Sequence, residues 1–329
     1  MKSPRLWPLL TAFWEALFEV KKVLGESLCL AFDTSNYTTS AAVFDGSEFA
    51  VSSKRLPVEK GKLGLRQNDA LFHHIKNLPD VLSKLELKEQ RLYAIGASAA
   101  PREAKDSYMP CFLAGHSFGL SMSSVINIPY YSFSHQQGHI AAAAWNSGYP
   151  ELMDTEFLAW HISGGTTELL RVEPSGTAFR CAAVGGTSDL AAGQLIDRIG
   201  LMLGLQFPCG SHLDMLSLES QSDAYFTIRA EGLFFSLSGM ENKISFLYKN
   251  GMSPPDIARY TLLSISRAVS SITANAKKLY GELPILFSGG VSSASLLRTE
   301  NPDGIFCSPD FSTDNALGTA ILTFREAVY

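Results

Sequence analysis

Apolar runs that lead straight into a small polar turn are the most regular pattern in this 329-residue chain. They occupy residues 28–46, 157–176 and 283–297, where β-forming residues are followed by Gly, Ser and Thr. The first two predict a strand, a tight turn and a second strand, and the third predicts a buried strand that leads into a helix. Turns of this kind expose backbone N–H groups that bind anions. A single glycine-rich turn is most often only a turn, so the repetition carries the prediction.

Helical periodicity fills the intervals between these runs. Apolar residues recur at spacings of three and four in residues 189–205 and 255–281, which predicts two amphipathic helices. No low-complexity linker separates the chain into halves. The pattern therefore predicts a bilobal α/β body in which strands and helices are intermixed.

Two histidines four residues apart, His135 and His139, stand directly before the alanine run 141–144. Alanine favours a helix, and residues at i and i+4 share one helix face with about 5–6 Å between their Cβ atoms. That spacing suits two ligands of one divalent ion. An ordinary polar helix surface gives the same pattern, so both interpretations remain open on these residues alone.

Composition narrows the class of protein. A content of 46% hydrophobic and 18% charged residues is typical of a globular chain, and a net charge of -5 argues against coating nucleic acid by bulk electrostatics. Five scattered cysteines without C-x-x-C spacing indicate reduced thiols, a cytoplasmic location and no zinc-thiolate site. No window reaches the ~18 apolar residues of a membrane span. Residues 1–27 are interpreted as an N-terminal extension rather than a signal peptide.

Six motifs occur in the order found in one known family. They are H-Q-Q-G-H from His135, H-I-S-G-G from His161, and the segments 190–210, 234–244, 287–298 and 310–321. With them the sequence resembles the TsaD/Gcp/Kae family, the tRNA N6-adenosine threonylcarbamoyltransferases, also described as glycoprotease M22-like, as a divergent member. The resemblance runs from residue 28 to the C-terminus. It implies the actin-like, Hsp70-like and sugar-kinase-like ATPase fold with two RNase H-like lobes, residues 28–134 plus 305–329 and residues 135–304.

The family transfers the threonylcarbamoyl group from threonylcarbamoyl-adenylate to N6 of the adenosine next to the tRNA anticodon. By resemblance, His135, His139 and Asp314 bind one divalent metal, with iron and zinc as the expected ions. Two imidazoles and one carboxylate leave coordination positions open, as a catalytic metal requires. The resemblance assigns no catalytic side chain.

Substrate contacts are carried over to the matching positions, which are His161, Ile162, Ser163, Gly164, Gly165, Asp197 and Gly210. The expected partners are tRNA and the TsaB-like and TsaE-like subunits of the threonylcarbamoyladenosine synthase, with no membrane. The basic stretch 53–77 is the candidate surface for tRNA, although a solvated charged face is the commoner explanation of such a run.

The sequence departs from the family pattern at several site positions. The family's T-S-x-D-E-T is replaced by residues 34–39, which contain neither acid. The other departures are Thr166 in S-G-G-H-T, Arg102 in G-P-G, Gln194 in D-D-A-A-G-E, Ala294 for a nucleoside-contacting Asn, and Cys209 for the first Gly of P-G-G. The acidic pair proposed to act near the carbamoyl group is therefore missing, and nucleoside recognition is altered.

Three alternatives compete with a transferase. A silent scaffold or regulatory partner of an active homologue fits the missing acids, whereas His135, His139 and Asp314 argue against it. A metalloprotease needs a glutamate beside the first histidine, and Gln136 stands there. An ATP-using kinase of the same fold needs only the phosphate turns and has no use for the histidine pair.

Overall fold

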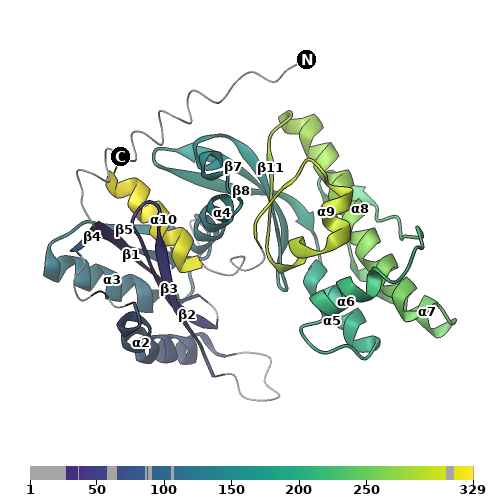
Figure 1. Ribbon diagram of the computed structural model, residues 1–329, viewed down its shortest axis with the longest axis horizontal. Coiled ribbons are helices and arrows are strands. Elements are labelled where there is room, and N and C mark those ends of the chain that lie inside the picture. The colour runs from purple at the N-terminus through teal and green to yellow at the C-terminus, as the bar shows by residue number, and fades with distance from the viewer. Residues whose placement is uncertain are drawn as a thin grey trace.

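The computed structural model describes residues 27–35, 37–57, 65–85, 87, 91–104, 107–308 and 315–328 (Figure 1). The expected extension 1–27 lies outside these ranges except for Ser27. Asp314 also lies outside them, as do Lys60 and Lys62 of the basic stretch.

The first sheet contains five strands in the order β3-β2-β1-β4-β5. They are β1 (Ser27–Asp33), β2 (Thr38–Phe44), β3 (Phe49–Arg55), β4 (Arg91–Ala100) and β5 (Tyr130–Ser134). The pairs β1–β2 and β2–β3 are antiparallel, whereas β1–β4 and β4–β5 are parallel. The predicted hairpin of residues 28–46 is confirmed, and its turn lies at the end of β1 where polar residues follow the apolar run.

Helices cover both faces of this sheet. The helices α2 (Gln67–Ser83) and α3 (Phe112–Ile126) pack together, and Leu78, Ala114 and Ile95 belong to the same apolar cluster beneath them. The C-terminal helix α10 (Asn315–Val328) packs against β1, β2 and β4, so the two ends of the described chain lie side by side (Figure 1).

The second sheet contains seven strands in the order β12-β11-β6-β7-β8-β10-β9. They are β6 (Phe157–Ile162), β7 (Thr167–Ser175), β8 (Ala178–Thr187), β9 (Ala230–Glu231), β10 (Phe234–Phe235), β11 (Ile285–Ser288) and β12 (Ile305–Phe306). The predicted strand, turn and strand of residues 157–176 is confirmed as β6 and β7, which pair antiparallel.

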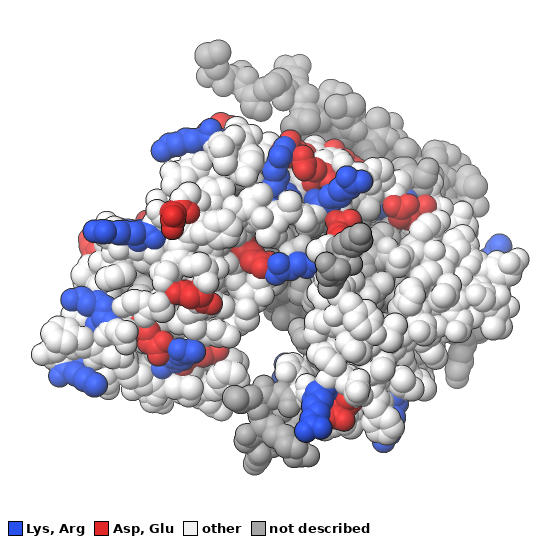
Figure 2. Space-filling view, turned by 180° about the vertical axis from the view of Figure 1, so that it is seen from behind, with Lys and Arg blue, Asp and Glu red and all other residues white. Residues whose placement is uncertain are grey.

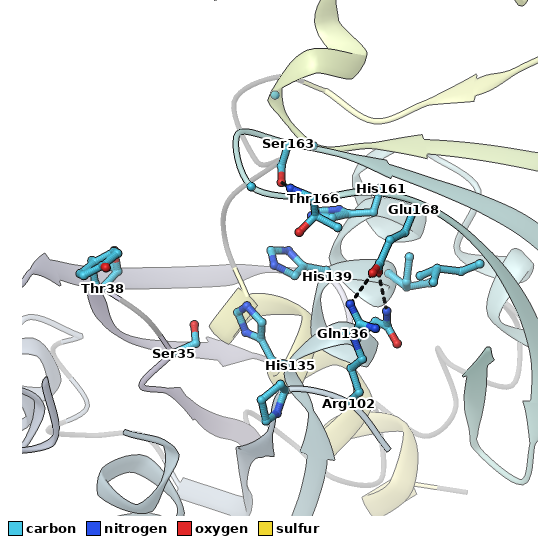
Figure 3. A pocket seen from close by; sticks show the side chains of 17 residues that line it. Ser35, Thr38, Arg102, His135, Gln136, His139, His161, Ser163, Thr166 and Glu168 are labelled. Atoms are coloured by element: carbon cyan, nitrogen blue, oxygen red, sulfur yellow. Dashed lines mark hydrogen bonds and ion pairs between the residues drawn. The ribbon is translucent and has the colours of Figure 1, made fainter. Parts of the chain in front are cut away.

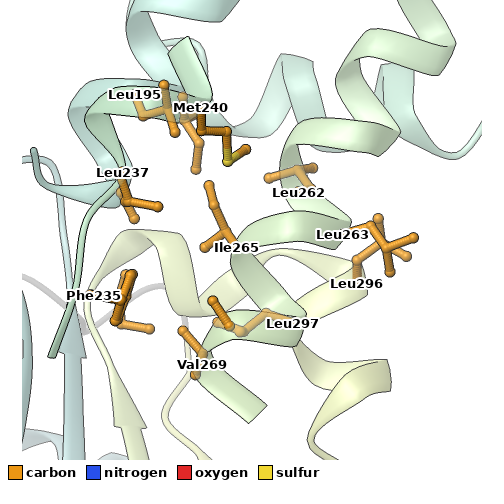
Figure 4. Packing of buried hydrophobic residues seen from close by; sticks show 14 of the residues in the cluster. Leu195, Phe235, Leu237, Met240, Leu262, Leu263, Ile265, Val269, Leu296 and Leu297 are labelled. Carbon is orange, nitrogen blue, oxygen red and sulfur yellow. The ribbon is translucent and has the colours of Figure 1, made fainter. Parts of the chain in front are cut away.

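The helices of this half are α5 (Ala192–Met202), α6 (Gly210–Ser217), α7 (Ser238–Lys249), α8 (Pro254–Tyr280) and α9 (Ser295–Glu300), with short 3-10 helices at Pro150–Asp154 and Gly290–Ser293. The two predicted amphipathic helices are confirmed as α5 and α8. Residues of α8 such as Leu262 and Ile265 are buried against α5, α7 and α9 (Figure 4).

A second apolar cluster joins the two halves. Helix α4 (His135–Asn146) and α10 share it with strands of both sheets, through Ala31, Leu170 and Leu286. Within the described ranges, no helix combines the length and apolarity that a membrane crossing requires. The exact division into residues 28–134 plus 305–329 and 135–304 stays a prediction.

Candidate metal and nucleotide site

A cavity of about 450 Å³ lies between strand ends and turns of the two sheets. The first half contributes residues after β1 and β4, and the second contributes the β6–β7 turn and the turn after β11. The residues that line it are Ser35, Tyr37, Thr38, Pro101, Arg102, His135, Gln136, His139, Ile140, His161, Ser163, Gly165, Thr166, Glu168, Leu170, Gly289 and Gly290.

Three histidines form a row in this cavity (Figure 3). The ring centroids of His135 and His139 are 4.4 Å apart, and those of His139 and His161 are 4.7 Å apart. His135 and His139 come from the first two turns of α4, as their spacing predicts, whereas His161 comes from β6. His135 and His139 therefore face this cavity rather than bulk solvent.

Burial keeps two of these rings neutral. It lowers the pKa of His139 well below the usual value, and the neighbouring His135 and His161 lower it further. Burial, and then His135, lower the pKa of His161 to about 4. Neutral imidazole is the form that binds a metal ion, because its unprotonated nitrogen offers a lone pair.

Asp33, at the end of β1, orients the first histidine. Its Oδ2 lies 2.8 Å from His135 Nδ1, and its Oδ1 accepts hydrogen bonds from the N–H and hydroxyl of Ser35 at 3.0 and 2.6 Å. Burial alone would raise the pKa of Asp33, but attraction to His135 and the hydrogen bonds from His135 and Ser35 hold it below its usual value. With Nδ1 bonded to Asp33, Nε2 is the nitrogen that would face a metal, as in carboxylate–histidine–metal arrangements.

The start of α4 is fixed by a capping box. The Ser134 hydroxyl accepts from Gln137 N at 3.2 Å, and Gln137 Oε1 accepts from Ser134 N at 2.8 Å. One turn of α4 then packs closely on α10, because a Cβ on Gly318 would lie 1.8 Å from the carbonyl oxygen of Gly138. Only glycine permits this approach, and Gly138 lies between the two histidines in sequence.

The β6–β7 turn offers backbone groups to an anion. Ser163 N donates to Thr166 O at 2.8 Å and Thr166 N donates to the Ser163 hydroxyl at 3.2 Å, which closes the turn. A Cβ on Gly164 or Gly165 would meet no atom within 4 Å, so this part of the turn faces open space. Such a turn can bind phosphate through its N–H groups.

A second cavity, of about 480 Å³, adjoins the first, since Gly290 lines both. Gly164, Asp197 and Gly210 line it, as do Asp214, Met215, Leu262 and Ala294. Asp197 Oδ1 accepts a hydrogen bond from Cys209 N at 2.8 Å, so this carboxylate also anchors the loop before α6. The altered position Ala294 lies on the wall of this cavity, and the Cys209 side chain is buried beside it.

The residues expected to bind substrate are thus divided between two cavities. His161, Ser163 and Gly165 line the first, whereas Gly164, Asp197 and Gly210 line the second, and Ile162 is buried and lines neither. The structure brings His135 and His139 together, and Asp314 lies outside the described residues. Among the residues that are described, no three His, Cys, Asp or Glu side chains converge as a ready-made metal site.

Sequence reasoning missed two polar contacts of the first cavity. One is Asp33 with His135, and the other is an ion pair between Arg102 and Glu168, whose second oxygen lies 3.5 Å from Gln136 Nε2 (Figure 3). A signal was present in both cases, because Asp33 ends an apolar strand and Arg102 replaces a family glycine. The partners are distant in sequence, so neither contact followed from spacing.

Solved structures share this fold at low sequence identity. HypF of T. kodakarensis matches with a TM-score of 0.57 and 14% identity over 92% of this chain and 48% of that one. Component A of (R)-2-hydroxyglutaryl-CoA dehydratase from Acidaminococcus fermentans matches with a TM-score of 0.53 and 16% identity over 92% and 99%. The fold is therefore the two-lobed α/β fold of actin-like ATPases and sugar kinases, as the sequence predicted.

Sequence relatives are more specific. Proteins named tRNA N6-adenosine threonylcarbamoyltransferase match from Thermus thermophilus, with 30% identity over 82% of both chains, and from Kosmotoga olearia, with 27% identity over 91% of this chain and 93% of that one. The family model described as TsaD, tRNA N6-adenosine threonylcarbamoyltransferase, matches residues 68–321. The chain belongs to this family.

Proposed function

We propose that the chain transfers the threonylcarbamoyl group from threonylcarbamoyl-adenylate to N6 of the adenosine next to the tRNA anticodon. One observation carries the proposal within this family. The neutral ring of His139 stands beside His135 and shares one cavity with the Ser163–Thr166 turn, so two imidazoles that could bind a metal lie next to a turn that could bind an anion.

The donors present fit a divalent metal. His135 and His139 would supply two nitrogens, with Asp33 holding the first ring in position, and Asp314 is proposed as the oxygen ligand. Support for Asp314 comes from α10, which begins at the next residue and packs through Gly318 on Gly138 of α4. Iron or zinc bound there would polarise the carbamoyl carbonyl and offset phosphate charge.

The chain's own groups would divide the substrate between them. The turn at Ser163 and Gly165 would hold phosphate oxygens through backbone N–H groups, and the second cavity would take the adenosine. Asp197 would accept from ribose hydroxyls with the oxygen that Cys209 N does not occupy. With the adenylate in one cavity and the acyl group in the adjoining one, the carbamoyl carbon would be held in a fixed orientation for attack by the amine.

The acceptor and partners are also proposals. In the basic stretch 53–77, Lys54 pairs with Asp80 at 2.8 Å. The stretch therefore offers less positive charge to RNA than its composition suggests. On the face seen in Figure 2, Lys and Arg are interspersed with Asp and Glu. A tRNA would thus be held by local contacts, with TsaB-like and TsaE-like subunits as the proposed partners.

A second candidate function is a scaffold that supports an active homologue. The specific observation in its favour is that Tyr37 and Thr38 line the first cavity where the family pattern has its acidic pair. A chain of this kind would retain metal and substrate binding without turning over.

The direct test incubates the purified chain and its partner subunits with threonylcarbamoyl-adenylate and unmodified tRNA, and measures the modified nucleoside by mass spectrometry. The proposal predicts product that a chelator abolishes and that added metal restores. Product that persists without metal would refute metal dependence. No product from this chain, together with stimulation of an active homologue, would favour the scaffold.

A further inference from the structure

Arg102 is the one permanently cationic side chain among the described residues that line the first cavity, and Glu168 is the one carboxylate. Arg102 follows β4 in the first half of the molecule, whereas Glu168 lies on β7 in the second. The two side chains form an ion pair across the cavity (Figure 3). None of the functions argued above uses this pair.

The backbone around Arg102 is held in place from both halves. Pro101 O accepts from Gln136 N at 3.1 Å, and Arg102 N donates to the Ser107 hydroxyl at 3.0 Å. The next residue, Glu103, accepts from Cys181 N of β8 at 3.3 Å. A guanidinium on an anchored loop is pre-organised, so it loses less entropy when it binds a ligand.

The guanidinium is only partly used by its ion pair. One nitrogen, Nη2, donates to Glu168 Oε1, and the other oxygen of Glu168 lies 3.5 Å from Gln136 Nε2. Nε and Nη1 make no hydrogen bond to any described residue, and the Arg102 side chain is 48% exposed. A guanidinium has two edges that match a carboxylate, Nε with Nη2 and Nη1 with Nη2, and each edge uses one of the two hydrogens of Nη2. Glu168 occupies one of these hydrogens, so one complete edge remains for the two oxygens of a second carboxylate.

We propose that Arg102 recognises the carboxylate of the substrate's acyl group, so that the site selects acyl-adenylates whose acyl part is an anion. This inference rests on the proposed function, since the threonylcarbamoyl group carries one free carboxylate. Phosphate has its own place at the Ser163 turn, and Figure 3 shows Ser163 and Arg102 on opposite sides of His139. The phosphate of the substrate would therefore be bound by the Ser163 turn, and its carboxylate by Arg102.

Glu168 is a positioning residue in this account. It holds the guanidinium toward the cavity through Nη2, while its own charge opposes a second carboxylate nearby. The competing explanation is a structural tie between the halves, in which neither residue contacts substrate. The two accounts differ in what happens when either side of the ion pair is made neutral.

The experiment compares two unreactive probes by calorimetry on the metal-loaded chain. One is the 5′-sulfamoyl adenosine analogue of threonylcarbamoyl-adenylate, and the other has the threonine carboxylate replaced by a carboxamide. Arg102→Gln should weaken binding of the carboxylate probe about tenfold or more and leave the carboxamide probe unchanged. Arg171→Gln is the matched control. Arg171 lies on the same strand as Glu168 and pairs with Glu156 at 2.6 Å, but it is not among the residues that line the cavity.

Glu168→Gln distinguishes substrate recognition from a purely structural ion pair. It should strengthen binding of the carboxylate probe, because the opposing charge is removed while the amide oxygen can still accept the hydrogen bond from Arg102 Nη2. Equal losses for both probes in both variants would overturn the proposal in favour of the tie. Equal affinity of the unaltered chain for the two probes would also overturn it, with the proposed function intact. Binding of neither probe would refute the proposed substrate, and the inference would fall with it.

Discussion

The two adjoining cavities are built from different kinds of residue. The first holds three histidines, Arg102 and Glu168 beside a polar turn. The described residues that line the second are mainly glycines and apolar residues such as Ile196, Leu262 and Val291, and its charged side chains are the carboxylates Asp197 and Asp214. Chemistry is therefore concentrated in the first cavity, while the second is suited to hold a flat apolar ring by shape.

Departures from the family pattern occur in both cavities. In the first cavity Tyr37 and Thr38 have replaced acids, yet the imidazoles and their Asp33 support are in place. In the second, Ala294 lines the wall and Cys209 is buried where the resemblance implies an Asn and a Gly that contact the nucleoside. The first cavity thus combines the histidine row with the loss of the expected acids, whereas the second keeps Asp197 without the expected Asn, and the following predictions test the two cavities separately.

The largest effect is expected from His139→Ala. The variant should fold, lose its bound metal and lose transfer activity on the order of a hundredfold or more, because one of two nitrogen donors is gone. Metal analysis of the purified protein and a tRNA modification assay measure both quantities. His116→Ala is the control, since His116 bonds to Tyr130 at 2.8 Å outside both cavities. Equal metal in His139→Ala and the parent would remove this site assignment.

Asp33→Asn should weaken metal binding by about 10–100-fold without abolishing it, because the amide cannot stabilise the His135 ring as a carboxylate does. Competition with a coloured chelator gives the affinity. Asp80→Asn removes an exposed carboxylate that pairs with Lys54 and Lys84, and it should have no effect. If both variants bound metal like the parent, Asp33 would have no positioning role.

In the second cavity, Asp197→Ala should weaken adenine-nucleotide binding by about 1–3 kcal/mol, through loss of a charged acceptor and of the anchor for Cys209 N. Calorimetry with AMP measures the change, and Asp223→Ala serves as an exposed control. Metal content should stay at the level of the parent in both. A loss of metal in Asp197→Ala would break the proposed separation of the two cavities.

The smallest effect is expected in the dependence of folding stability on pH. In the metal-free chain the pKa of His161 is lowered to about 4 from its usual value near 6.5. Between these values the unfolded chain binds the proton and the folded chain does not, so stability should fall as pH decreases from 6.5 to 4. Denaturant titration should show a loss of about 1 kcal/mol or more that is reduced in His161→Gln. An identical pH profile for both proteins would show that His161 does not titrate in this way.

Local patterns predicted the parts of the site that depend on neighbours in sequence. The spacing of His135 and His139 and the alanines after them were enough for α4, and small turn residues were enough for the Ser163 turn. The contacts of Asp33 with His135 and of Arg102 with Glu168 join residues 102 and 66 positions apart. They arise because the ends of β1 and β4 meet the beginnings of α4 and β7, which tertiary packing decides and spacing does not encode.

Helix α10 illustrates the same limit. Its amphipathic sequence is compatible with several surfaces, and its place beside α4 depends on a close contact of two glycines, Gly138 and Gly318. Only the resemblance to the family linked this end of the chain to the histidines. The role of Asp314 stays a prediction, since that residue lies outside the described ranges.

The most direct test of the central claim uses cells in which this gene is the only member of its family and the rest of the pathway is intact. Mass spectrometry of their tRNA nucleosides measures threonylcarbamoyladenosine. The transferase predicts the modified nucleoside at normal levels, and its loss in His139→Ala cells. Absence of the nucleoside, with the unaltered protein present, folded and metal-bound, would contradict the transferase.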